Sequence, residues 1–396
     1  MIERLDFNLR GITHIDGKVI FVDNALPGEE VKVNILKDEK TYSLAEVKEY
    51  ITKSPKRIKS KCPYFDTCGG CMIRNINYND GLNYKKENVI EIIKRNANID
   101  INPKVIKNEQ KDLYRNKIEI KCIDGKYGFY KRNSHNLVEI DRCLNAEEPI
   151  NKMIMHLEDL NLSNGEITIK CNNMGEILLN IITKDICNID VDHLREKVKL
   201  VGIVYNDRII YGNDYFMETI DNKLYKESYN SFFQVNRYIN EKLITTLKEN
   251  IDDNSIVLDL CCGVGTLGLS IAEKCKKVYG IEIVKNAIED AKFNAKINNI
   301  NNAEYILGDA FVLMEDIKDI DIIIIDPPRN GISKNGIKNV LNKKINKLIY
   351  ISCNPITLAR DLNLLKEEYD IKKSYVLDMF SYTNHIESLV VLERKK

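Results

Sequence analysis

The sequence lacks the features that mark membrane proteins, secreted proteins and uniformly basic nucleic-acid-binding proteins. No uninterrupted apolar stretch approaches the roughly 18 residues of a membrane-spanning helix. The first ten residues include Glu3 and Asp6 and no apolar signal-peptide segment. An excess of one charge is also absent, because 59 basic side chains balance 59 acidic ones. A uniformly basic surface is therefore excluded, although a local basic patch is not. We expect a soluble, cytoplasmic protein without a membrane partner.

Length and cysteine content then narrow the class of protein. The 396 residues, 44% of them hydrophobic, are enough for two or three domains of roughly 100–200 residues each. Three of the eleven cysteines, Cys62, Cys68 and Cys71, lie within ten residues. In a reducing compartment such a cluster indicates metal ligation rather than disulfides. Zinc and iron–sulfur sites both use cysteine thiolates, so the spacing alone leaves the metal open.

The N-terminal 50 residues have the pattern of a small β module. Residues 19–22 and 31–35 are β-branched runs separated by a turn signal. This pattern suits an OB-like barrel that holds RNA, and equally any other small β module. Residues 53–61 then carry five basic side chains and no acidic one. They form either a phosphate-contacting strip or an ordinary basic linker.

From residue 254 onward, short apolar strands alternate with helices. Residues 113–230 precede this region and read as a mixed domain of short strands and turns. The later strands are predicted at 256–260, 278–283, 305–307, 322–325 and 348–352, with helices at 266–274 and 285–298. Continuous apolar strands that alternate with helices indicate a parallel, doubly wound sheet, hence an α/β fold.

A glycine-rich loop follows the first of these strands. Gly263, Gly265 and Gly268 fit G-x-G-x-x-G, and Glu282 ends the next strand, where a carboxylate can bind ribose hydroxyls. The loop alone does not separate a nicotinamide cofactor from S-adenosylmethionine (SAM). Asp309 after the third strand and the Asp326-Pro-Pro-Arg sequence after the fourth favour SAM.

Two strand ends carry residues suited to methylation of a pyrimidine carbon. Asp326 ends the fourth strand and Cys353 the fifth. Uracil C5 is a weak nucleophile, but addition of a thiolate to C6 develops negative charge at C5, which then attacks the methyl group. A base must finally remove the C5 proton, and Glu387, directly before the terminal strand, is the candidate. The alternatives are a buried strand cysteine and a solvated glutamate.

Together these motifs resemble those of the bacterial RNA uracil-5-methyltransferases. The motifs that match are Asp259-Leu-Cys-Cys-Gly-Val-Gly, Asp326-Pro-Pro-Arg, Ser352-Cys-Asn-Pro, His385-Ile-Glu, Ser231-Phe-Phe-Gln-Val-Asn, Tyr114-Arg-Asn-Lys and Gly128-Phe-Tyr-Lys-Arg-Asn-Ser-His. The resemblance implies a TRAM domain at 1–55 (an OB-like RNA-binding barrel), a central α+β domain at 56–230 and a Rossmann-like SAM domain at 231–396. It implies Cys353 as nucleophile and Glu387 as base.

The resemblance also implies cofactor-binding and metal-ligating residues. Gln234, Glu282 and Asp326 match SAM-site positions, with Cys261 and Asp309 as weaker matches. The ribosomal-RNA members hold a 4Fe–4S cluster, for which Cys62, Cys68, Cys71 and a distant fourth cysteine would be the ligands. Cys143 takes the fourth position, although Leu144 replaces the usual proline after it, and Cys122 is the reserve.

These observations predict a SAM-dependent enzyme that makes 5-methyluridine in 23S ribosomal RNA. The alternatives are the same chemistry on tRNA, methylation of an RNA amine without Cys353, and an iron–sulfur RNA-binding protein with an inactive methyltransferase domain. Arg115, Lys117, Lys131, Arg132 and residues 53–61 are candidates for RNA backbone contacts. No DNA and no obligate protein partner are expected.

Overall fold

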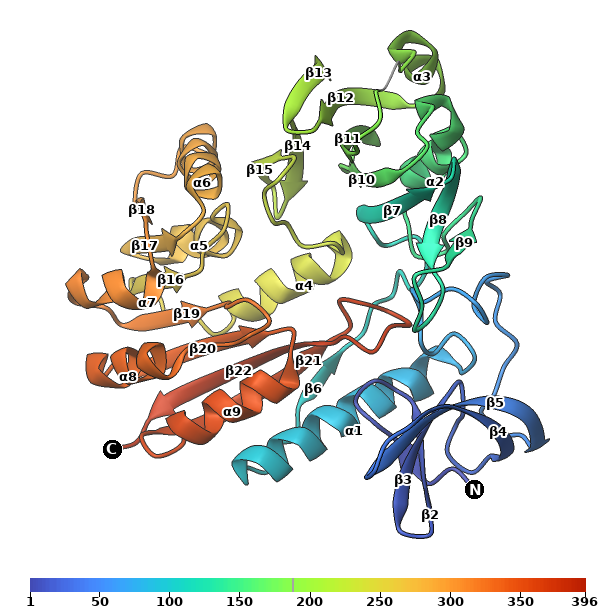
Figure 1. The fold of residues 1–396 in the computed structure, drawn as a ribbon. Coiled ribbons are helices and arrows are strands. Elements are labelled where there is room, and N and C mark those ends of the chain that lie inside the picture. Colours follow the sequence, from blue (N-terminus) through green and yellow to red (C-terminus); the bar gives the residue numbers. More distant parts are fainter. Residues whose placement is uncertain (187–188) are drawn as a thin grey trace.

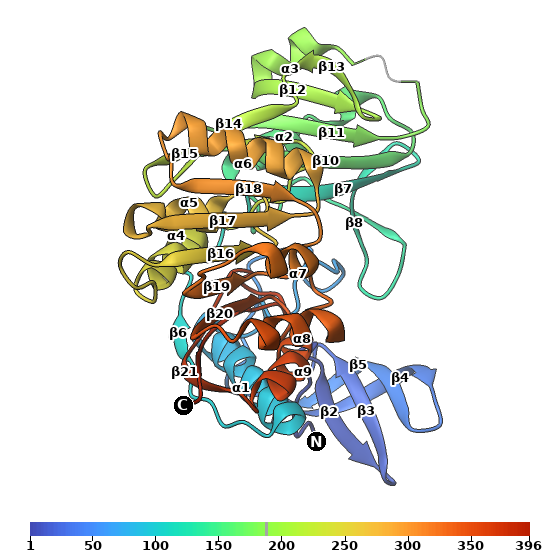
Figure 2. The same ribbon diagram turned by 90° about the vertical axis from the view of Figure 1, so that its left-hand side faces the viewer.

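The computed structural model describes residues 1–186 and 189–396. The described residues form three β-sheets and one separate β-hairpin. In Figure 1 the N-terminal sheet lies at the lower right, the central sheet at the upper right and the C-terminal sheet at the left. Figure 2 shows the same arrangement from the side of the C-terminal sheet.

The N-terminal sheet has five strands in the order β1-β2-β3-β5-β4. Its strands are β1 (Arg4–Leu5), β2 (Gly11–Ile15), β3 (Lys18–Asp23), β4 (Glu30–Asp38) and β5 (Tyr42–Thr52). β3 and β5 pair in parallel, and the other neighbours pair antiparallel. A small apolar core that includes Ile20, Val22 and Ala45 holds the sheet together. The predicted all-β module is therefore confirmed, with both predicted strands in place.

The central sheet has seven strands in the order β13-β12-β11-β10-β7-β8-β9. Its strands are β7 (Lys117–Ile123), β8 (Lys126–Tyr130), β9 (Leu137–Glu139), β10 (Gly165–Cys171), β11 (Glu176–Ile182), β12 (Lys199–Tyr205) and β13 (Arg208–Gly212). The accompanying helices are α2 (Glu148–Ile154), α3 (Val191–Lys197) and a 3-10 turn at Leu157–Leu160. Alternate apolar side chains such as Ile118 and Ile120 enter one core with α2.

The C-terminal sheet has eight strands in the order β18-β17-β16-β19-β20-β22-β21-β6. Its strands are β6 (Lys104–Ile106), β16 (Ile256–Leu260), β17 (Lys277–Glu282), β18 (Ala303–Leu307), β19 (Ile322–Ile325), β20 (Lys347–Ser352), β21 (Tyr369–Leu377) and β22 (Glu387–Arg394). β16 to β20 pair in parallel, and β22 lies antiparallel between β20 and β21.

Helices cover both faces of this sheet. They are α5 (Thr266–Ile271), α6 (Lys285–Ile297), α7 (Ala310–Leu313), α8 (Lys334–Lys343) and α9 (Pro355–Leu365), with 3-10 turns at Ala272–Lys274 and Met314–Asp316. In β19, Ile322 and Ile324 belong to one core, whereas Ile323 and Ile325 belong to the other. Burial on both faces explains the uninterrupted apolar run. The predicted doubly wound α/β fold is confirmed.

Two further helices and the separate β-hairpin lie beside the C-terminal sheet. Helix α1 (Tyr78–Ala97) is capped by Asn77, whose side chain accepts a hydrogen bond from Asp80 N. The helix packs against α9. The hairpin of β14 (Tyr215–Ile220) and β15 (Lys223–Ser228) precedes α4 (Arg237–Lys248). Helix α1 and strand β6 come from the range predicted for the central domain but lie against the C-terminal sheet. The predicted domain boundaries themselves stay a prediction.

In the described residues, no helix is both long enough and apolar enough to cross a bilayer.

Candidate active site

The glycine-rich loop lies between β16 and α5, where the backbone takes a conformation that favours glycine. φ is +54° at Gly263 and +84° at Gly265, and Cys261 also has a positive φ of +62°. A Cβ atom at Gly265 would lie 2.6 Å from Tyr305 Oη, so only glycine fits there. Gly263 N donates to Glu282 Oε2 at 3.1 Å, which ties the loop to the end of β17.

Asp259 stabilises the same loop through a hydrogen bond to the helix that follows it. Its side chain is fully buried in β16, and Oδ2 accepts a hydrogen bond from Gly268 N at 3.0 Å. Oδ1 has no hydrogen-bond partner. Burial, together with the negative charges of Asp326 and Glu282, raises the pKa of Asp259 to about 8. Its role could not be predicted from the sequence, because a single acid within an apolar strand carries no distinctive signal.

The predicted cofactor-binding acids lie at one edge of the sheet. The parallel strand β17 ends at Glu282. Asp309 comes two residues after the end of β18, and Asp326 comes directly after β19. Asp309 is exposed and caps α7 by accepting a hydrogen bond from Phe311 N at 2.9 Å. Asp326 is half-buried, and desolvation raises its pKa to about 7. In open α/β sheets this edge is where ligands bind.

Cys353 and Glu387 are brought together by the antiparallel pairing of β20 and β22. Ser352 pairs with Ser388, so Cys353, one residue beyond the end of β20, lies beside Glu387 at the start of β22. The Glu387 side chain is 2% exposed, and its Oε1 has no hydrogen-bond partner. The two residues that the proposed chemistry requires are therefore neighbours in space.

The electrostatics of this pair favour the protonated state of both groups. Burial and the nearby Glu387 raise the pKa of the Cys353 thiol to about 11, whereas Arg329 lowers it by charge and by a hydrogen bond. Burial and the charge of Asp326 raise the pKa of Glu387 well above its usual range, against the effect of Arg329. Arg329 is thus the nearby group that favours ionisation of both side chains. Arg329 stands in the Asp326-Pro-Pro-Arg motif, but the sequence alone does not predict this effect.

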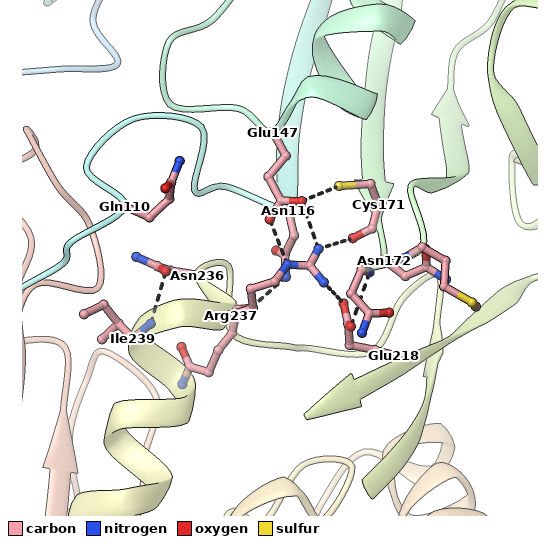
Figure 3. Close-up of polar contacts among 12 residues, drawn as sticks. Gln110, Asn116, Glu147, Cys171, Asn172, Glu218, Asn236, Arg237 and Ile239 are labelled. Atoms are coloured by element: carbon pink, nitrogen blue, oxygen red, sulfur yellow. Dashed lines mark hydrogen bonds and ion pairs between the residues drawn. The ribbon is translucent and has the colours of Figure 1, made fainter. Parts of the chain in front are cut away.

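Gln234 lies in the segment between β15 and α4, next to a strand-like segment of the central region. Asn116 Nδ2 donates to Gln234 O at 3.1 Å, and Asn116 N donates to Val235 O at 3.0 Å. Figure 3 shows how Arg237, the first residue of α4, joins this region to the central sheet. The Arg237 guanidinium donates to both carboxylate oxygens of Glu147, at 2.8 and 3.0 Å, and to Glu218.

All four predicted metal-ligating cysteines line one cavity of about 250 Å³. Cys62, Cys68, Cys71 and Cys143 share it with apolar side chains and with Arg74 and Arg115. Across residues 1–186 and 189–396, no group of three or more His, Cys, Asp or Glu side chains is placed to hold a metal ion. Cys122, the reserve ligand, is not among the lining residues, and its Sγ donates to Leu162 O at 3.3 Å.

The predicted RNA-contacting residues divide into structural and free groups. In the basic strip, Arg57 forms a buried ion pair with Glu29 and therefore holds the N-terminal sheet. Arg132 donates to Cys71 O at 2.8 Å and so supports the cysteine segment. Lys53, Lys59 and Lys131 are exposed. Of the two interpretations left open for residues 53–61, a phosphate-contacting strip or a basic linker, Arg57 fits the strip least, because its charge is already paired with Glu29; RNA contact by the other basic residues stays a prediction.

Comparison with known proteins gives consistent matches along the chain. The family model described as tRNA (uracil-5-)-methyltransferase matches residues 77–395, and the model described as TRAM domain matches residues 1–48. A protein of Halalkalibacterium halodurans named as an uncharacterized RNA methyltransferase is 32% identical over 442 residues, with 100% of this chain and 96% of that protein covered. A similarly named protein of Clostridium acetobutylicum is 33% identical over 447 residues, with 100% and 97% covered.

A solved structure with a similar fold is the tRNA (uracil-54, C5)-methyltransferase of Pyrococcus abyssi, in complex with S-adenosyl-L-homocysteine. It superposes with a TM-score of 0.80 at 25% identity and covers 99% of both chains. The similarity therefore extends over all three sheets.

Proposed function

The chain belongs to the tRNA (uracil-5-)-methyltransferase family and is a SAM-dependent RNA (uracil-5-)-methyltransferase with a TRAM domain; on this premise we propose that it methylates C5 of a uridine in 23S ribosomal RNA, with Cys353 as nucleophile and Glu387 as base. The observation that carries the proposal is the juxtaposition of these two side chains across β20 and β22. They lie beside the Asp326 loop, at the edge of the sheet that carries the cofactor residues.

Cys353 would begin the reaction as a thiolate. With a pKa of about 11 the thiol is protonated at first, so it must pass its proton to solvent water when the substrate enters, and Arg329 favours that transfer. The sulfur then bonds to C6 of uracil, and the electron pair of the C5–C6 double bond moves toward C5 and the ring carbonyl. The ring becomes nucleophilic at C5 without further help from the chain.

Glu387 would complete the reaction. In the ionised form, which Arg329 favours, the unpartnered Oε1 of Glu387 is buried beside Cys353, where it can accept the C5 proton. Burial makes the ionised carboxylate a stronger base than one in water. When the proton leaves C5, its electron pair restores the C5–C6 double bond, and the bond between sulfur and C6 breaks with its electrons returning to Cys353.

The residues at the sheet edge fit SAM, which supplies the methyl group when bound. The carboxyl groups of Glu282 and Asp326 both lie near the buried Asp259 and form an acidic site that suits a cationic ligand. Glu282 would hold the ribose hydroxyls, with Gly263 and Gly265 allowing close approach of the loop. Gln234, Cys261 and Asp309 are the further proposed contacts.

The cysteine cavity fits a 4Fe–4S cluster better than a single metal ion. A four-iron cluster is larger than one ion, so its four thiolate ligands would surround a cavity rather than converge on one point. Cys62, Cys68, Cys71 and Cys143 surround such a cavity, and Arg74 and Arg115 offset the negative charge of the ligands. The cluster would support the fold and RNA binding. Anaerobically purified protein should absorb near about 400 nm and contain iron and sulfide; a colourless protein with one zinc would contradict this assignment.

Two RNA classes are the candidate substrates. The cysteine cavity supports 23S ribosomal RNA, because the resemblance links the cluster to the ribosomal-RNA members. The Pyrococcus abyssi structure favours tRNA as the second candidate, since a tRNA enzyme covers 99% of this chain. The TRAM domain therefore does not separate the two substrates.

The deciding experiment is nucleoside mass spectrometry after incubation with SAM and either unmodified 23S ribosomal RNA or unmodified tRNA. Wild-type protein should form 5-methyluridine in ribosomal RNA, and Cys353→Ala should form none. Product in tRNA alone would keep the mechanism and overturn the substrate. The Glu387→Gln variant should accumulate a covalent RNA adduct that is visible on a denaturing gel, whereas rapid turnover by that variant would refute the role of Glu387.

A further inference from the structure

Residues 378–386, the loop between β21 and β22, lead directly into Glu387 and are called here the base loop. Four consecutive carbonyl groups of this loop each accept a hydrogen bond from a different part of the chain. Building on the proposed role of Glu387, we infer that these bonds position the catalytic base, and that Tyr114 and Asn236 are positioning residues for the proton-removal step.

The donors come from four segments that are distant in sequence. Asn236 Nδ2 donates to Met379 O at 3.1 Å, and Lys85 Nζ donates to Phe380 O at 3.0 Å. Tyr114 Oη donates to Ser381 O at 3.0 Å. The backbone N–H groups of residues 72 and 73 donate to Tyr382 O at 2.9 and 3.2 Å. The base loop is therefore held by α1, by the start of α4 and by two segments of the central region.

The three side-chain donors are buried, so water cannot replace them. Tyr114 and Asn236 are fully buried, and Lys85 is 2% exposed and also pairs with Asp378 at 2.6 Å. A buried carbonyl that loses its donor stays without a partner, and the loop must shift to recover one.

The backbone of the base loop also indicates that it is held in place from outside. Tyr382 has a φ of +63°, which is unfavourable for a side chain of this size. Its carbonyl receives two hydrogen bonds, and the Arg74 guanidinium lies 4.1 Å from the centre of its ring. Such a conformation persists where the surrounding structure imposes it, as is common near active sites.

Both positioning residues belong to motifs of the family resemblance, but neither residue has a role of its own in the proposed chemistry. Tyr114 begins Tyr114-Arg-Asn-Lys, and Asn236 ends Ser231-Phe-Phe-Gln-Val-Asn. Asn236 has two functions, because its Oδ1 caps α4 by accepting from Ile239 N at 3.2 Å while its Nδ2 reaches Met379 (Figure 3 shows the cap). The two groups of one side chain thus join the segment that carries Gln234 to the loop that carries the base.

The base loop connects to Glu387 but not to Cys353, which follows β20. Loosening the loop should therefore slow removal of the C5 proton more than addition of the thiolate. This predicts a step-specific defect rather than a general loss of activity, and a merely structural role would not produce it.

The test compares Tyr114→Phe and Asn236→Asp with wild type, using whichever of 23S ribosomal RNA or tRNA the wild type methylates, transcribed with 5-deuterouridine. Tyr114→Phe removes one hydroxyl, and Asn236→Asp keeps the cap acceptor but removes the donor to Met379. The matched control is Tyr369→Phe, since the buried Tyr369 hydroxyl donates to Ile345 O at 2.7 Å, away from the base loop. Affinity for S-adenosylhomocysteine, measured by calorimetry, checks that Tyr114→Phe is folded.

We expect turnover by both variants to fall about fivefold, the effect of one lost hydrogen bond. The fraction of covalent adduct and the deuterium isotope effect should both rise, and Tyr369→Phe should behave as wild type. Equal adduct fractions in wild type and both variants would overturn the inference, provided that Glu387→Gln accumulates adduct. If Glu387→Gln itself forms no adduct, the proposed base is wrong, and the inference fails with it.

Discussion

The buried carboxyl group of Asp259 makes the stability of the SAM domain depend on pH in an unusual direction. Burial and the charges of Asp326 and Glu282 raise its pKa to about 8, from 3.8 for an ordinary aspartate. The folded protein therefore keeps this proton at pH values where the unfolded chain has lost it. By linkage, the free energy of unfolding falls as the pH rises from about 4 to about 8.

Replacing Asp259 with asparagine should remove that fall. The amide has nearly the shape of a protonated carboxyl group, and its oxygen can still accept the hydrogen bond from Gly268 N. A pKa difference of one unit corresponds to about 1.4 kcal/mol. The full difference between 3.8 and about 8 therefore limits the loss of unfolding free energy to about 6 kcal/mol. Relaxation of the charged state reduces this limit, and we expect Asp259→Asn to be more stable than wild type by about 2–4 kcal/mol at pH 8.

The assay is urea unfolding of both proteins at several values between pH 4 and pH 8.5, followed by a probe in the SAM domain. The difference in free energy between Asp259→Asn and wild type should be small at pH 4 and grow with pH. Asp321→Asn is the matched control, because Asp321 accepts from Ile256 N at 2.8 Å at the other end of the same strand but is exposed. A difference between Asp259→Asn and wild type that stays constant with pH would refute the reasoning.

Three further perturbations test the cofactor loop, the nucleophile and the N-terminal sheet. Gly265→Ala should weaken binding of S-adenosylhomocysteine about tenfold by calorimetry, because the new Cβ meets Tyr305 Oη at a backbone φ of +84°; unchanged affinity would contradict the assigned loop. Arg329→Gln should raise the pKa of Cys353 and slow its alkylation at pH 8 about tenfold, followed by mass spectrometry of the Cys353 peptide; an equal or faster rate would remove Arg329 from that role. Glu29→Gln should destabilise the N-terminal sheet by about 3 kcal/mol in thermal unfolding, because it leaves Arg57 unpaired; the exposed neighbour Glu30→Gln should have little effect, and equal effects would refute the ion-pair argument.

The local features of the fold could be predicted because they depend on short-range patterns. The run of four isoleucines in β19 and the glycine-rich loop after β16 each reveal their structure within a few residues. Strand β6 could not be predicted in the C-terminal sheet, because three residues carry no periodicity and their pairing with β21 is decided by packing.

The sequence allowed the members of the candidate site to be proposed but not their geometry. The chemistry of uracil methylation selected Cys353 and Glu387, but their adjacency depends on the insertion of β22 beside β20. The structural role of Arg57 could not be predicted. Its basic neighbours are typical of RNA binding, whereas its buried partner, Glu29, lies far away in the sequence. Contacts between residues that are distant in sequence depend on tertiary packing, so a local sequence pattern does not predict them.

The short segment of residues 113–116 has a consequence for how the substrate must be accommodated. Its backbone bonds to residues 144 and 145 on one side and to Val235 on the other, and Tyr114 also reaches the base loop. Residues 113–116 are thus hydrogen-bonded to the central region, to the segment before α4 and to the base loop at once. These contacts oppose relative movement of the three regions, so in the proposed mechanism the deformation needed to bring a uridine to Cys353 falls mainly on the RNA. The proposed mechanism then favours uridines in loops, which unstack at low cost.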